Sequence, residues 1–422
     1  MPALRPASRF LTIALVLLLG SFRTDGILAQ AVAVAASPQP VSGRLETVDG
    51  MRVLTLWGDP EARGRATGQL MHDAFFEILE GYVLSLEFTG GALWDKVVRP
   101  RILERFVFDE DHRAWARGLL EGLRSAGEGA IRSRKLGRDL EVEDVLATSC
   151  VPDLAGLLCS SFVAWGDAAD AGGVLMGRNL DYVGTKGLAS NTIMVVEMAR
   201  EGHLGWVGVG YPGLYGCLTG VNEKGVSIAI HDVFERAAKG ARGFTTRVVA
   251  LKEIIETAEP AEDLPAQAAA RLGRHRFALG GNAMLGYCGE KARGAAVLEF
   301  DDRDLPGLGR CCVRSAEPGR ESIVCTNHHR RRGSDGFFKC ERFAAVTGAL
   351  EHAARPLDLA GAWRTIETGS VRITLYRVVA DLSRGIVEVD HRPGPLADFG
   401  PRSRFEVAAL LGARHEVAPS PR

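Results

Sequence analysis

Apolar residues recur at helical spacing through the first part of the chain. Between residues 44 and 151 this spacing predicts helices rather than strands. The clearest helix is expected over residues 59–86, because an aspartate followed by proline, Asp59-Pro60, is a typical helix start. A second helix is expected over residues 111–131, and a third, shorter one over residues 142–148. The first part of the chain is therefore predicted to be a helical segment.

The pattern changes at Cys159, where short apolar or β-branched runs begin. Turn signals that contain glycine or proline separate these runs, which is typical of successive strands. Strands are predicted over residues 159–165, 174–177, 193–198, 205–209, 226–230, 295–300, 322–326, 373–380 and 386–389, and helices over residues 247–258 and 261–272. Strands that follow one another, with helices grouped apart, predict an α+β layered fold rather than alternating βαβ units.

The N-terminus has the layout of a secretory signal. Arg5 and Arg9 precede an apolar run over residues 10–20, and small residues follow over residues 29–36. The run is shorter than the ~20 residues that span a bilayer, so we expect residues 1–36 to be a signal peptide and processing region, in preference to a single membrane anchor. The mature protein is then secreted or periplasmic, without a stable membrane anchor. Residues 413–422 are expected to form a tail.

Composition and charge narrow the kind of partner. The 422 residues are 46% hydrophobic, which is ample for a large core, and the formal net charge is -1. A nearly neutral chain does not predict a nucleic-acid partner, so a small molecule is the expected ligand. No metal or cofactor is expected. The adjacent side chains of His328 and His329 would diverge on a strand, and the glycine pattern at residues 208–213 precedes more strand rather than a helix.

Cys159 is the candidate nucleophile because of its place in the chain. It opens a strand directly after a helical segment, and the return strand of the predicted hairpin brings Arg178 and Asp181 back toward its start. A thiol has a free pKa of ~8.5 and needs a partner to ionise at neutral pH. A guanidinium can serve, and so can the α-amine of Cys159 itself if the chain is cut after Leu158. Two alternatives are a purely buried, structural Cys159 and a rival nucleophile at Cys150.

Several motifs together resemble one enzyme family. The run Cys-Ser-Ser-Phe at residues 159–162, the Gly-Arg-Asn-Leu-Asp return strand at 177–181 and the Gly-Val-Asn-Glu-Lys-Gly-Val segment at 220–226 resemble the acyl-coenzyme A:6-aminopenicillanate acyltransferase family. They are also similar to the choloylglycine hydrolase and acid ceramidase group. The order continues with motifs at residues 58–64, 211–213, 326–328 and 341–343, so the resemblance covers roughly residues 50–400.

The resemblance implies a four-layer αββα N-terminal-nucleophile (Ntn) hydrolase fold and a precursor that is cut before Cys159. Residues 44–158 would then be a helical pro-segment that remains a partner, and residues 159–412 the catalytic core. By the same resemblance Cys159 is the nucleophile, and its new α-amine is the base. The other implied site residues are Asp181 beside the amine, Arg178 beside the thiolate, Asn327 and Asp232 at the oxyanion, Arg342 near the nucleophile and Tyr211 at the substrate.

Two positions depart from the family. Leu158 stands before the scissile bond where the family often has glycine, and Asp232 stands where asparagine is common. A carboxylate repels an oxyanion unless only its backbone N–H is used. Arg372 and Arg377 are rivals of Arg342.

The expected substrate is a small-molecule amide with a hydrophobic acyl group, such as an amide of a fatty acid, a bile acid, a β-lactam side chain or an acyl-homoserine lactone. Hydrolysis and acyl transfer both remain open, and a homo-oligomer is compatible with the sequence. The aromatic residues expected around the acyl group are Trp165, Tyr182, Tyr211 and Tyr215, although each could equally be part of the core. Residues 330–332, all arginine, are expected in a solvated loop, or facing an anionic substrate group.

Two other functions are kept as alternatives. A papain-like thiol protease would pair Cys159 with His231 or His328, but the Cys-Gly-Ser-Cys-Trp context of that class is absent. A secreted binding protein that has lost catalysis on the same fold would be consistent with the unusual Leu158 and Asp232.

Overall fold

The computed structural model describes residues 41–412 except residues 88–90, 155, 157, 183, 185, 235–237, 239–240, 334–339 and 355. The expected signal region, residues 1–36, and the expected tail, residues 413–422, lie outside the described residues. Among the helices of the described residues, none combines the length and hydrophobicity that a membrane span requires.

Within the described residues the strands form one nine-stranded sheet, one six-stranded sheet and a two-stranded hairpin. In spatial order the larger sheet contains β1 (Gly43–Val48), β2 (Met51–Leu56), β7 (Ile193–Glu197), β8 (Trp206–Gly210), β9 (Thr219–Asn222), β10 (Val226–Val233), β11 (Gly280–Cys288), β12 (Arg293–Leu305) and β13 (Gly309–Arg314). The smaller sheet contains β14 (Ser322–Cys325), β5 (Leu158–Trp165), β6 (Val174–Asp181), β15 (Thr374–Asp381), β16 (Ile386–His391) and β17 (Ser403–Glu406). The separate hairpin consists of β3 (Arg132–Ser133) and β4 (Arg138–Asp139).

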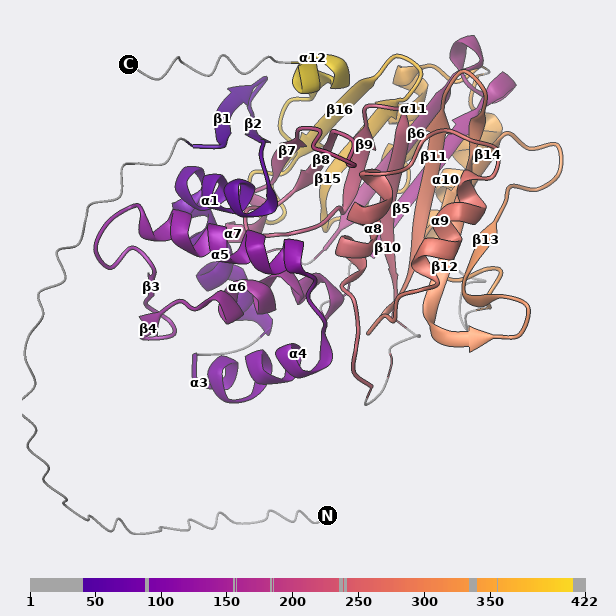
Figure 1. Ribbon diagram of the computed structural model, residues 1–422. Coiled ribbons are helices and arrows are strands. Elements are labelled where there is room, and N and C mark those ends of the chain that lie inside the picture. The colour runs from indigo at the N-terminus through magenta and orange to yellow at the C-terminus, as the bar shows by residue number, and fades with distance from the viewer. Residues whose placement is uncertain are drawn as a thin grey trace, which may run out of the picture. The chain divides into compact units, whose positions relative to one another are not determined.

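Helices cover the outer faces of both sheets, while the inner faces of the sheets pack against each other. On the outside of the larger sheet lie α8 (Arg247–Ile255) and α9 (Leu264–Leu272), and α10 (Glu341–His352) and α11 (Leu359–Glu367) cover the smaller sheet. Between the sheets, β10, β11 and β12 contact β5 (Figure 1). The expected α+β architecture with αββα layers is therefore confirmed.

The remaining helices belong mainly to the first part of the chain. They are α1 (Pro60–Leu70), α2 (His72–Ile78), the π-helical segment η1 (Leu79–Glu87), α3 (Gly91–Leu93), η2 (Trp94–Val98), α4 (Arg99–Arg105), α5 (Glu110–Arg124), α6 (Val142–Ser149) and the short turn η3 (Val151–Asp153). Later in the chain lie the short turns η4 (Gly166–Ala168) and η5 (Asp170–Gly172), α7 (Lys186–Ala189) and α12 (Val407–Gly412).

The helical prediction for residues 44–151 is wrong at its start. Residues there form β1 and β2, and β2 pairs in parallel with β7, with Val53 opposite Met194. The apolar run of β2 is buried on nearly all its residues, and such a run cannot be assigned to helix or strand by periodicity alone. The helix expected over residues 59–86 is also divided at Met71, whose φ of -125° is not helical.

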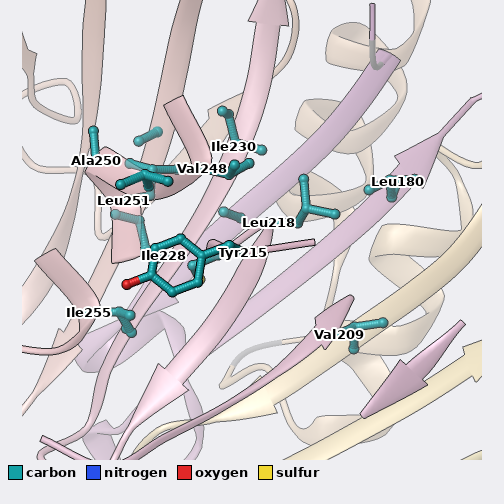
Figure 2. Packing of buried hydrophobic residues seen from close by; sticks show 14 of the residues in the cluster. Leu180, Val209, Tyr215, Leu218, Ile228, Ile230, Val248, Ala250, Leu251 and Ile255 are labelled. Atoms are coloured by element: carbon teal, nitrogen blue, oxygen red, sulfur yellow. The ribbon is translucent and has the colours of Figure 1, made fainter. Parts of the chain in front are cut away.

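The core between α8 and β10 illustrates how the apolar pattern is used. Figure 2 shows Val248, Leu251 and Ile255 of α8 beside Ile228 and Ile230 of β10. Their spacing of three or four residues on the helix and two on the strand puts each set on one face. All five side chains are buried, so these two patterns fix the helix against the sheet.

Candidate active site

The hairpin of β5 and β6 sets the position of Cys159. The strands are antiparallel, with Leu158 opposite Asp181, Cys159 opposite Leu180, and Ser161 opposite Arg178. The predicted pairing of the two strands is thereby confirmed. Alternation along β5 turns Cys159 toward the larger sheet and Phe162 toward the helices α10 and α11, where they join different apolar clusters.

A buried guanidinium contacts the thiol. Arg178 Nη2 donates to Cys159 Sγ at 3.2 Å, and Arg178 Nη1 donates to the carbonyl of Leu218 at 2.8 Å. Both Cys159 and Arg178 are completely buried. A cation within hydrogen-bonding distance stabilises a thiolate, so this contact is suited to a nucleophilic cysteine.

A second set of contacts surrounds the backbone of Cys159. Its N–H donates to Asn327 Oδ1 at 2.7 Å, and Arg342 Nη2 donates to the same oxygen at 2.9 Å. Arg342 Nη1 donates to the Cys159 carbonyl at 3.0 Å and to Asp181 Oδ2 at 2.9 Å. The hydroxyl of Thr374 donates to the other oxygen of Asp181 at 2.6 Å. The nitrogen that would become the α-amine therefore lies in a polar ring that contains a carboxylate.

The pKa values in the uncut chain differ from their ordinary values. Burial raises the pKa of Cys159 to about 11, although Arg178 acts in the opposite direction. Burial also raises the pKa of Asp181 to about 6, against the hydrogen bond from Thr374 and the charge of Arg342. The thiol of the uncut chain is therefore protonated at neutral pH and needs a base before it can attack.

Asp232 contributes its backbone to this site and turns its carboxylate away. On β10, His231 faces β5, where its Nε2 lies 2.8 Å from the Ser161 hydroxyl. The next side chain, Asp232, faces α8 and forms an ion pair with Arg247 at 2.7 Å. Its carbonyl accepts a hydrogen bond from Asn327 Nδ2 at 2.9 Å. The unusual acidic residue is thus paired with a cation.

An apolar cavity is lined by neighbours of Cys159 and Arg178, although not by these two residues themselves. It has an empty volume of about 540 Å³, including the part open to solvent, and Leu180 and Leu218, both labelled in Figure 2, form part of its wall. Leu180 is the partner of Cys159 in the hairpin, and Leu218 supplies the carbonyl that binds Arg178. Residues from the first part of the chain and from the later core both line the cavity: Ile78, Tyr82, Val83, Thr148, Val151, Pro152, Tyr182, Leu188, Tyr211, Pro212, Gly213 and Leu214.

The four predicted aromatic residues do not line one common pocket. Tyr182 and Tyr211 line the apolar cavity. Tyr215 instead stacks on His112 with ring centroids 4.6 Å apart, and Trp165 ends β5, six residues from the thiol. Trp165 lies far from the thiol because each residue of an extended strand advances the chain by about 3.3 Å.

The arginines at residues 330–332 are not simply a solvated loop. Their three backbone N–H groups donate to the carboxylate of Glu299, each at 2.8 Å. Arg332 is buried and pairs with Asp301 at 2.8 Å. The prediction is wrong for Arg332, because a run of like charges in the sequence does not reveal acidic partners on a distant strand.

The rival candidates have other partners. Arg377 forms an ion pair with Asp390 at 2.5 Å, and Arg372 is exposed, so of these three rivals it is Arg342 that contacts Cys159. Cys150 is buried, its pKa is raised well above the ordinary value by burial, and it lies against the carbonyl of Leu146.

Cys340 is a thiol that the motifs did not single out. It is half-buried and directly precedes α10, the helix that carries Arg342. Burial acts to raise its pKa, but hydrogen bonds with His328 and Thr326 outweigh burial and lower the pKa to about 6. Its position next to the Glu341-Arg342-Phe343 motif is the only sequence signal that could have drawn attention to it.

Metal binding has no support in the described residues, where no group of three or more His, Cys, Asp or Glu side chains is arranged to hold an ion.

Comparison with known proteins addresses the family. Residues 168–347 match the model of the acyl-coenzyme A:6-aminopenicillanic acid acyl-transferase family. The resemblance to this family is confirmed. The matched range includes Arg178, Asp181, Asn327 and Arg342, and it begins nine residues after Cys159. The family description is that of an acyl-transferase, and the match supports an enzyme of the amidase and acyltransferase class.

Solved structures with similarity to the chain include two hydrolases. The Caenorhabditis elegans ortholog of N-acylethanolamine-hydrolyzing acid amidase is 21% identical, with a TM-score of 0.40 over 53% of this chain and 93% of that chain. A mutant of the conjugated bile acid hydrolase from Clostridium perfringens is 14% identical, with a TM-score of 0.40 over 60% of this chain and 94% of that chain. No curated protein sequence matches the chain.

Proposed function

We propose that the protein is an exported, self-processing cysteine amidase or acyltransferase that acts on small-molecule amides with a hydrophobic acyl group. The observation that carries the proposal is the pair of contacts at Cys159: Arg178 on its sulfur and Asn327 on its backbone nitrogen. The first suits a nucleophile, and the second suits an amine that becomes a base after cleavage. Residues 1–36 would direct export to the periplasm or the medium.

Self-processing would use the same thiol. Sγ of Cys159 gives up its proton and attacks the carbonyl carbon of Leu158, the C–N bond breaks, and the proton ends on the Cys159 nitrogen, which becomes the α-amine. Water then hydrolyses the thioester and releases the new carboxylate of Leu158. Leucine is bulkier than the glycine common in the family, but Leu158 is held as a strand residue opposite Asp181, which supports cleavage at this bond.

Turnover would follow the same chemistry with an external amide. The α-amine takes the thiol proton, and the thiolate attacks the substrate carbonyl to form a tetrahedral intermediate. Asn327 Nδ2, beside the Asp232 carbonyl, is the proposed oxyanion donor, and one such donor contributes about 10²–10³ in rate. The ammonium protonates the leaving amine as the C–N bond breaks. Water or a second amine then takes the acyl group from Cys159. Asp181 and Arg342 would orient the amine throughout.

The apolar cavity supports the proposal that the substrate carries a hydrophobic acyl group. Its wall includes Leu180, the strand partner of Cys159, and Leu218, whose carbonyl binds Arg178, and we propose that an acyl chain in the cavity would direct its carbonyl toward the thiol. Each methylene buried there would contribute about 0.8 kcal/mol. We therefore expect kcat/KM for N-acyl aminocoumarin amides to rise with acyl length until the cavity is full.

The first test is the intact mass of the secreted protein, with wild type beside Cys159→Ala. We expect two fragments in wild type, the larger beginning at Cys159, and one chain in the variant. A single chain in both would contradict self-processing and favour a binding protein on this fold.

Activity is then measured on the same amides, with and without an added amine acceptor, to separate hydrolysis from acyl transfer. Cys340→Ser is the matched control for inactivation by thiol reagents. The lowered pKa of Cys340 makes it a second thiolate that such reagents would modify beside Cys159. Turnover should survive Cys340→Ser and be lost in Cys159→Ala; unchanged turnover in Cys159→Ala would sink the proposal.

A further inference from the structure

A buried arginine outside the Cys159 group joins two distant parts of the chain. Arg247 is the first residue of α8 and is only 1% exposed. Its Nε donates to Asp153 Oδ1 at 2.8 Å, and its Nη1 donates to Asp232 Oδ1 at 2.7 Å. Nη2 donates to the carbonyl of Pro152 at 2.7 Å, and Nη1 also donates to that of Gly280 at 3.1 Å. One guanidinium thus holds two carboxylates and two backbone carbonyls.

The backbone of α8 holds the Asp153 carboxylate as well. The N–H of Arg247 lies 3.2 Å from each carboxylate oxygen of Asp153. The carboxylate therefore lies at the N-terminal end of α8, where the helix dipole favours an anion. Asp153 ends the turn η3 and precedes Cys159 by six residues. This clamp fixes the chain shortly before the proposed cleavage point.

A second contact holds the same stretch. A Cβ added to Gly156 would overlap the ring of Phe234, so the ring lies directly on the backbone there. Glycine is the residue that permits so close an approach. Phe234 follows Asp232 by two residues and comes directly after β10. Two contacts from the proposed catalytic core, at Asp153 and Gly156, therefore hold the segment that leads to Leu158.

The charge of Arg247 also matters to the thiol. Burial is the main cause of the raised pKa of Cys159, and the negative charge of Asp232 adds to it. Burial acts to lower the pKa of Arg247, but Asp232 and Asp153 outweigh burial, so Arg247 remains charged. Without Arg247 the buried Asp232 carboxylate would lose the cation that offsets its charge near the nucleophile.

We propose that Arg247 is a positioning residue for self-processing, which holds the chain before Leu158 against the strand that carries Asp232. This inference rests on the proposed function, since it concerns the same cleavage. Asp153 and Arg247 then have different roles. Asp153 acts on the cleavage step alone, because it belongs to the segment before the cut. Arg247 acts on cleavage and also on turnover, because it continues to offset the charge of Asp232 in the cut enzyme.

The test follows self-cleavage by mass spectrometry after cell-free synthesis of wild type, Arg247→Met and Asp153→Ala. We expect both variants to cut at least about tenfold more slowly, because a displacement of the reacting groups by about 1 Å can cost a hundredfold in rate. The cut fraction of each is then assayed with an N-acyl aminocoumarin amide across pH. Asp153→Ala should keep a kcat close to wild type, whereas Arg247→Met should lower kcat and move the acid limb of its pH profile upward.

A double variant separates positioning from general stability. Arg247→Met with Asp232→Asn removes the carboxylate together with the cation that offsets it, so kcat should recover toward wild type while cutting stays slow. Arg247→Lys is the second variant if Arg247→Met does not fold. It keeps the charge but lacks the planar fork that binds both carboxylates, so it should cut slowly with a nearly normal pH profile.

Arg377→Met is the matched control, because it breaks a largely buried pair with Asp390 on the smaller sheet. It should cut at the wild-type rate. Equal cutting in wild type, Arg247→Met and Asp153→Ala would overturn the inference while leaving the proposed function intact. Equal slowing in Arg377→Met would also overturn it, since the effect would then be general destabilisation. A wild-type chain that is never cut would overturn both proposals.

Discussion

Asp181 is a buried carboxylate whose hydrogen-bond partners only partly offset the cost of burying its negative charge. It accepts hydrogen bonds from Thr374 and Arg342, yet burial still raises its pKa to about 6. A raised carboxyl pKa is informative, because perturbed groups in buried polar clusters are frequent at functional sites. In the uncut chain the cluster contains no α-ammonium, so the carboxylate is held without the partner that cleavage would supply.

The raised pKa predicts a pH-dependent stability of the uncut chain. Asp181 binds its proton more tightly in the folded state than in the unfolded state, where its pKa is the ordinary 3.8. Its contribution to the free energy of unfolding is therefore complete below about pH 4 and is lost as pH rises through about 6. The loss corresponds to roughly 3 kcal/mol, at 1.36 kcal/mol per pKa unit.

The comparison uses Cys159→Ala with and without Asp181→Asn, since neither variant is expected to cut itself. Denaturant unfolding should give similar stabilities for the two at pH 4, and the Asn variant should be relatively more stable at pH 7. A difference between the variants that does not change with pH would contradict the assignment of this pKa to Asp181.

At the scale of elements, two helices of the first part cross with their backbones in close contact. Gly64 and Gly68 of α1 face Gly118 and Gly122 of α5. A Cβ at Gly64 would overlap the carbonyl of Trp115, and one at Gly118 would overlap that of Glu61. The four-residue spacing of each glycine pair puts both members on one helix face, which permits the approach. The sequence shows these spacings, but the facing of the two pairs is visible only in the fold.

Gly118→Ala should destabilise the protein by at least about 2 kcal/mol, because the new methyl group meets backbone that cannot move aside. Gly348→Ala is the matched control: it lies within α10, and a Cβ there meets nothing within 4 Å. That change should be neutral or stabilise by about 0.5–1 kcal/mol, the usual preference of a helix for alanine. Thermal unfolding of the two variants beside wild type measures the difference. Equal midpoints for Gly118→Ala and wild type would show that the helices can separate at little cost.

At the scale of the whole molecule, the proposed pro-segment is built into the larger sheet. β2 lies between β1 and β7, so strands from before and after Cys159 share one hydrogen-bonded sheet. Arg63 of α1 also forms a buried ion pair with Glu197 of β7 at 2.6 Å. Removing the pro-segment would expose the edge of β7 and break a buried ion pair, both of which are unfavourable.

The two chains produced by cleavage are therefore expected to stay together. Native size-exclusion chromatography of the cut enzyme should give a single species that contains both fragments, and guanidinium chloride should separate them. Spontaneous release of the smaller fragment in native buffer, with the larger fragment still folded, would contradict this expectation.

The sequence alone determined the local features of this protein. The change of pattern at Cys159, the hairpin that brings Arg178 and Asp181 back toward it and the layered α+β class follow from periodicity and turn chemistry, which depend on neighbouring residues. The family resemblance, confirmed over residues 168–347, named residues that the structure brings together, such as Asn327 and Arg342.

Only the tertiary structure decided what depends on contacts between distant residues. Asn327 lies 168 positions from Cys159 and Arg247 lies 94 from Asp153, so no local pattern reports either contact. The pairing of β2 with β7 and the turning of the Asp232 carboxylate toward Arg247 belong to the same class. Each contact forms because an unpaired buried charge or an unpaired strand edge destabilises the folded state. Any distant residue of suitable chemistry can supply the partner, so the partner is known only once the sheets have packed.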